Sequence, residues 1–101
     1  MDLSNISLWS ISELKQRLQA GLNPNTVINN FLRVYLIHVW ARQGSIAHLT
    51  VLYYAGANFN NRTRQGYSVY DELLLQWDKT KDDRYTQCID WLRQHKVTMD
   101  E

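Results

Sequence analysis

Ser68, His38 and Asp71 together carry the side chains of a hydrolase triad. Such a triad needs a histidine base beside the serine and backbone N–H groups that stabilise the oxyanion. No glycine turn that could form an oxyanion hole accompanies Ser68. Ser68 and Asp71 also have the spacing of a capping box at the start of a helix, which explains both residues without catalysis. The sequence therefore predicts a protein that is not an enzyme.

The possible metal ligands are scattered along the chain. His38, His48 and His95 are far apart, and neither paired cysteines nor an H-E-x-x-H motif is present. The lone Cys88 excludes an internal disulfide and fits a reducing compartment. It lies among apolar residues of an amphipathic segment and has no basic neighbour that would lower its pKa, which indicates a small buried side chain. No glycine-rich phosphate loop occurs either, so we expect no metal and no cofactor.

Arginines are the other residues with binding chemistry. Arg62 and Arg64 precede Tyr67, and together with Arg33 and Arg42 they could contact phosphates. The net charge is only +1, from 11 basic and 10 acidic residues, which gives no strong field towards nucleic acid or an anionic membrane. A nucleic-acid-associated helical protein is therefore the less favoured alternative to a protein-binding one.

Composition and capping patterns predict the elements that would position these residues. A chain of 101 residues with 45% apolar residues, four glycines and one proline indicates one folded helical domain, residues 1–101. Capping boxes start at Ser10 and Ser68, and Thr80 with Asp83 is a third candidate. Apolar spacing predicts helices over residues 11–20, 30–42, 46–55, 69–77 and 84–95.

The segment 30–42 is the ambiguous one, because its continuous run VYLIHVW is rich in β-branched and aromatic residues. Its length and helical neighbours favour a central helix that is buried all round. The apolar run is also only about ten residues long and contains Arg33 and His38, which is half of what a membrane span requires. The N-terminal residues show no secretory signal. We expect a cytoplasmic protein without membrane contact.

An internal repeat organises the chain. LKQRLQAGLNPN (residues 14–25) aligns with LTVLYYAGANFN (residues 49–60), 35 positions later, and a weaker third copy covers residues 88–97. The domain then divides into four parts: an N-terminal partial repeat (1–28), a central repeat (29–61), a C-terminal repeat with an insert at residues 78–84 (62–97), and a tail (98–101).

The central repeat, YLIHVWARQGSIAHLTVLYYAGANFN (residues 35–60), resembles an ankyrin repeat. His38 occupies the family's histidine position, Gly44 one of its small-residue positions, and Gly56-Ala57-Asn58-Phe59-Asn60 its exit into a hairpin finger. The next unit, NNRTRQGYSVYD, has Gly66 and Ser68 at the family's glycine and threonine positions. The sequence departs from the family pattern at three positions, where Leu36 and Val69 replace the usual proline and Asp71 replaces the second histidine.

The resemblance implies an all-α, ankyrin-like stack of helix-turn-helix repeats with short, hairpin-like finger loops. In such a unit, His38 would bond backbone groups of the neighbouring finger. Gly56, Asn58 and Gly66 would shape a rigid loop whose tip, residues 62–65, projects. The concave surface of fingers and first helices would bind a partner. Carried over to this sequence, the partner-binding residues are Arg42, Gln43, Arg62, Arg64, Gln65, Tyr67, Leu75, Gln76 and Trp77.

The tryptophans are the remaining signal, because four are more than a core of this size needs. Trp40 and Trp91 lie on apolar helix faces and are expected in the core, whereas Trp9 and Trp77 are candidate exposed anchors. We expect a small inhibitor or adaptor that binds one target protein, as a monomer or weak homodimer. A phage- or pathogen-encoded inhibitor of a host defence complex is an alternative within that class.

Overall fold

The computed structural model describes residues 6–95, which are mostly helical with one small two-stranded sheet. The elements in chain order are η1 (Ile6–Leu8), α1 (Ile11–Gln19), β1 (Val27–Asn29), β2 (Val34–Tyr35), α2 (Leu36–Gln43), α3 (Ile46–Tyr54), α4 (Val69–Thr80) and α5 (Asp83–Gln94). No helix in this part of the chain is long and apolar enough to cross a membrane.

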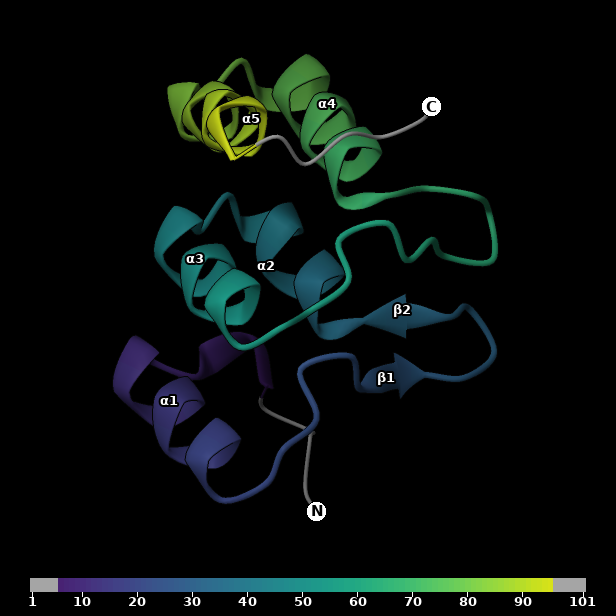
Figure 1. Cartoon of the computed structure of the whole chain (residues 1–101). Helices are drawn as coiled ribbons and strands as arrows, with labels where there is room; N and C mark the ends of the chain where they lie inside the picture. Colours follow the sequence, from purple (N-terminus) through teal and green to yellow (C-terminus); the bar gives the residue numbers. More distant parts are fainter. Residues whose placement is uncertain (1–5, 96–101) are drawn as a thin grey trace.

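The helices stack in layers, as Figure 1 shows. α1 packs on α3, which pairs with α2, and the α4–α5 pair covers the other side through contacts of α2 with α4 and of α3 with α5. The β1–β2 hairpin and the loop before α4 project to the same side of the stack (Figure 1). These projections can therefore form one surface.

Residues 30–35 correct the helix predicted over 30–42. α2 begins only at Leu36, and the preceding residues form the turn and second strand of an antiparallel hairpin. Asn29 closes the turn because its side-chain oxygen accepts a hydrogen bond from Leu32 N at 3.0 Å. Arg33 has a left-handed φ of 55°, and Tyr35 is an extended N-cap, so neither continues a helix.

The capping box predicted at Ser68 is confirmed, and the one predicted at Thr80 is wrong. The box at Ser68 is confirmed, since Ser68 N and Asp71 N bond each other's side chains. Thr80, by contrast, is the last residue of α4, and Asp82 caps α5 by accepting from Arg84 N at 3.0 Å. The segment predicted as an insert, residues 78–84, is therefore the end of α4, a turn at Lys81 and Asp82, and the start of α5.

The core confirms two of the tryptophan predictions and overturns a third. Trp40 is fully buried and Trp91 nearly so. Trp9 is only 5% exposed, so it is not the surface anchor that its serine neighbours suggested. It packs 6.3 Å from the Trp40 ring, and the Arg17 guanidinium covers it at 4.2 Å. Cys88 is buried as expected, and desolvation raises the pKa of its thiol to about 11.

Candidate binding surface

Two loops project from the helical stack and touch each other. We call residues 27–35 the first finger and residues 60–67 the second finger. Arg64 ties them together: its backbone N donates to Leu32 O at 2.7 Å, and its Nη1 donates to Phe31 O at 3.0 Å. The same guanidinium lies 4.9 Å from the centre of the Phe31 ring. The fingers therefore form one connected unit.

His38 fixes the base of this unit to α2. Its Nδ1 accepts from Tyr35 N at 3.1 Å, so Nε2 carries the proton and donates to Tyr67 O, also at 3.1 Å. Tyr67 O also accepts from Thr63 N at 2.9 Å, which closes the second finger. Burial of the His38 ring lowers its pKa, which favours the neutral imidazole. The expected bond from His38 to the neighbouring finger is thus present.

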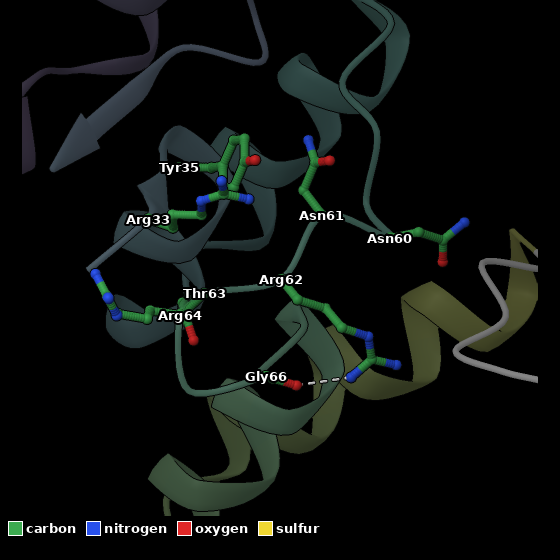
Figure 2. A pocket seen from close by; sticks show the side chains of 8 residues that line it. All are labelled: Arg33, Tyr35, Asn60, Asn61, Arg62, Thr63, Arg64 and Gly66. Atoms are coloured by element: carbon green, nitrogen blue, oxygen red, sulfur yellow. Dashed lines mark hydrogen bonds between the residues drawn. The ribbon is translucent and has the colours of Figure 1, made fainter. Parts of the chain in front are cut away.

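A hollow of about 690 Å³ lies between the fingers. Figure 2 shows the side chains around it, and no carboxylate is among them. Six of its lining residues are Arg33, Tyr35, Asn60, Arg62, Arg64 and Gly66. Arg62 turns towards Gly66, whose carbonyl accepts from Nη1 at 2.7 Å, and the same nitrogen lies 3.3 Å from Asp71 Oδ2. The hollow therefore presents hydrogen-bond donors and positive charge.

A second hollow, of about 450 Å³, runs from the second finger along α4. It shares Gly66 with the first, and Leu74 and Leu75 give it an apolar side. Asp71 and Asp78 also line it. The two hollows thus adjoin, one rich in arginine and the other apolar with an acidic rim.

Five of the nine predicted partner-binding residues gather here. Arg62 and Arg64 line the first hollow, and Gln65, Tyr67 and Leu75 line the second. Arg42, Gln43, Gln76 and Trp77 line neither hollow. Gln43 donates to Ser7 O at 2.8 Å, and Trp77 is half-buried with Lys81 Nζ 4.1 Å from its ring centre.

The sequence interpretation missed Phe31 and Leu32 at the tip of the first finger, and it considered Arg33 beside them only as a phosphate contact. Phe31 is 72% exposed and Leu32 40% exposed, although both were placed inside a helix. Asn29 and Asn30 immediately before them are turn formers, and that pair was the signal that could have identified the loop.

The histidines do not form the catalytic or metal-binding arrangements considered from the sequence. Both His38 nitrogens bond backbone atoms, while the Ser68 hydroxyl bonds Asp71. His48 instead contacts a different serine: Ser45 Oγ lies 2.5 Å from its Nδ1, and its Nε2 donates to Trp9 O at 2.7 Å. Ser45 is also the N-cap of α3, so this pair holds a helix start. Among residues 6–95, no three His, Cys, Asp or Glu side chains cluster as metal ligands would.

Arg42 is paired with Glu72 of α4, and we expect this pair to stabilise the fold. Both contacts, Nε to Oε1 and Nη2 to Oε2, are 3.2 Å long, and the Glu72 side chain is 5% exposed. Arg42→Met should lower the free energy of unfolding by about 1–2 kcal/mol, because it strands a buried carboxylate; the 46% exposure of Arg42 reduces the cost of losing a fully buried partner.

Urea denaturation measures this change, and Arg42→Met/Glu72→Gln is the matched control that removes the stranded charge. The double variant should regain part of the lost stability. If Arg42→Met has the same midpoint of urea unfolding as the native protein, the pair does not stabilise the fold, and Arg42 is available to contact a partner.

Comparisons of the chain with protein-family models, with curated proteins and with solved structures found no match.

Proposed function

We propose that this chain is a non-catalytic protein-binding module, a small inhibitor or adaptor that occludes one target. Its binding surface is formed by the two fingers and the adjoining side of α4. One observation carries the proposal: Phe31, Leu32, Leu74 and Leu75 expose 72%, 40%, 42% and 37% of their surface there. Large apolar side chains exposed on adjoining loops and a helix commonly mark a protein contact, and aromatic residues in particular serve as anchors.

The ties between the fingers support this role. Hydrogen bonds hold Arg64 to the first finger and Tyr67 to His38. A loop that is already ordered loses little conformational entropy when it binds, so more of the contact energy is available for affinity. The surface is therefore suited to a single, well-defined target.

Corresponding features of successive units support an ankyrin-like arrangement, which we include in the proposal. Tyr35 and Ser68, 33 residues apart, both precede a helix as N-caps. Asn25 N donates to Asn23 Oδ1 at 2.8 Å, and the aligned Asn60 N donates to Asn58 Oδ1 at 2.9 Å. In an ankyrin-like stack, the fingers and first helices would face the partner together, which is the surface described above.

Three arginines are already bonded within the fold, which favours a protein partner over nucleic acid. Arg42 is paired with Glu72, Arg62 with Asp71, and Arg64 with the carbonyl of Phe31. Arginines neutralised or bonded in this way have less capacity to bind a run of phosphates.

Removing two anchors tests the proposal. Phe31→Ser/Leu75→Ser should lower affinity for the partner by about 30- to 700-fold, since buried anchors typically contribute about 1–2 kcal/mol each. The native chain, tagged, is first used to capture its partner from lysate of the producing or host cell, with quantitative mass spectrometry. Affinity is then measured with the purified partner.

Leu8→Ser/Tyr54→Ser is the matched control, because Leu8 and Tyr54 are 80% and 73% exposed and line neither hollow. It should bind like the native chain, and circular dichroism should show both variants folded. Equal affinity of all three proteins would place the binding site elsewhere, and capture that nuclease abolishes would replace the protein partner with nucleic acid.

A further inference from the structure

We propose that the hollow between the fingers binds a carboxylate, the side chain of an Asp or Glu of the partner protein, with Arg33 as its main ligand. This assignment rests on the protein-binding role proposed above and specifies its ligand chemistry.

The backbone of Arg33 is the first observation. Its φ of 55° is left-handed, a conformation that costs an arginine free energy that glycine would not lose. Lys81 has a similar φ of 56°, but it ends α4, where left-handed residues are common, and its side chain reaches Asp78 and Trp77. Arg33 ends no helix. Its side chain makes no hydrogen bond or ion pair with residues 6–95, so an arginine at this position contributes nothing visible to the fold.

The groups around Arg33 are the second observation. It lines the hollow together with the Tyr35 hydroxyl and the Asn60 amide, and neither of these groups has a hydrogen-bond partner in the described part of the chain. Figure 2 shows Arg33 and Tyr35 side by side and Asn60 on the opposite side of the hollow. A guanidinium binds a carboxylate through two parallel hydrogen bonds, and hydroxyl and amide donors can satisfy its remaining lone pairs.

The number of available charges distinguishes a carboxylate from a nucleic-acid backbone. Arg64 donates to the Phe31 carbonyl and Arg62 lies against Asp71, so Arg33 supplies the charge for about one anion. Asp78, in the adjoining hollow, would repel further phosphates. The exposed ring of Phe31 lies beside the hollow. It can contact apolar residues that flank the acidic residue in the partner's sequence.

The test uses defined probes and the full chain labelled with ¹⁵N. The probe is the blocked peptide acetyl-Leu-Glu-Glu-Leu-amide, and acetyl-Leu-Gln-Gln-Leu-amide, inorganic phosphate and a short oligothymidine are compared with it by NMR titration. The acidic peptide should shift the Arg33 and Asn60 signals with a millimolar Kd, and the neutral peptide should bind at least 5-fold more weakly.

Three variants test the role of Arg33. Arg33→Gln should weaken acidic-peptide binding at least 5-fold, whereas Lys79→Gln, which removes the same charge from an exposed position on α4, should not. Arg33→Gly should weaken binding to the same extent while raising Tm, because glycine relieves the left-handed backbone.

Each other outcome overturns the assignment. Equal binding of the two peptides, no shift with the acidic peptide, or undiminished binding by Arg33→Gln would each exclude a carboxylate site at Arg33. Tighter binding of oligothymidine at the same signals would make the hollow a phosphate site. These results are independent of the Phe31→Ser/Leu75→Ser experiment, which can still establish a protein partner when the carboxylate assignment fails.

Discussion

Replacing Trp40 by alanine is expected to lower the free energy of unfolding by about 3–5 kcal/mol. The side chain is fully buried between the Trp9 ring, 6.3 Å away, and the His48 ring, which stacks on it at 4.8 Å and 11°. Alanine would leave a large cavity between α2, α3 and the segment before α1 that carries Trp9. A domain of this size has a total stability of about 5–15 kcal/mol, so the variant should be close to unfolding at room temperature. Chemical denaturation followed by circular dichroism measures the change.

Two further substitutions distinguish the destabilisation caused by a cavity in the core from that caused by losing an indole side chain as such. Trp77→Ala removes the same side chain from a half-buried position and should cost only about 1–2 kcal/mol. Trp40→Phe keeps a ring and removes the indole N–H, which is buried without a hydrogen-bond partner among the described residues, so it should cost less than Trp40→Ala. Similar losses for Trp40→Ala and Trp77→Ala would contradict the central place of Trp40 in the core.

Local patterns predicted the helices well where short-range chemistry sets their ends. Ser10 and Ser68 accept hydrogen bonds from the third residue of their helices, as their spacing indicated. α2 ends at Gln43, one residue beyond the predicted end at residue 42, and the left-handed Gly44 is its C-cap. Each of these features depends on residues a few positions apart, which the sequence displays directly.

The sequence predictions were wrong where contacts between residues far apart in the chain decide the local structure. Residues 30–35 include apolar side chains at spacings compatible with a helix. Leu36 N, however, bonds Thr26 O at 3.1 Å and Arg64 N bonds Leu32 O, and both contacts favour the hairpin. Trp9 is likewise buried by contacts with α2 and α3 that no local pattern displays. The candidate site was predictable on the second finger and missed on the first for the same reason.

His38→Leu is the second substitution with a large expected effect, about 2–4 kcal/mol at pH 7.5. Leucine fills much of the space of the buried imidazole, but the part-buried N–H of Tyr35 loses its acceptor and the second finger loses its bond from α2. The signals of residues 60–67 should also broaden or shift in ¹H–¹⁵N spectra, because Tyr67 is no longer held. His95→Leu, which changes the same residue type outside the fingers, should leave those signals in place.

The pH dependence of the stability lost in His38→Leu shows whether the loss comes from the ionisable imidazole or from packing alone. Burial lowers the pKa of His38 below its ordinary value of 6.5, so below about pH 6.5 the unfolded chain binds a proton that the folded chain does not. The native protein therefore loses stability as pH falls from 6.5 towards the lowered pKa, and His38→Leu lacks that contribution. Burial also lowers the pKa of His48, but His48 is present in both proteins and cancels in the comparison. The stability gap between native protein and variant should narrow between pH 7.5 and 5.5, and a constant gap would show that His38 is not held neutral in the fold.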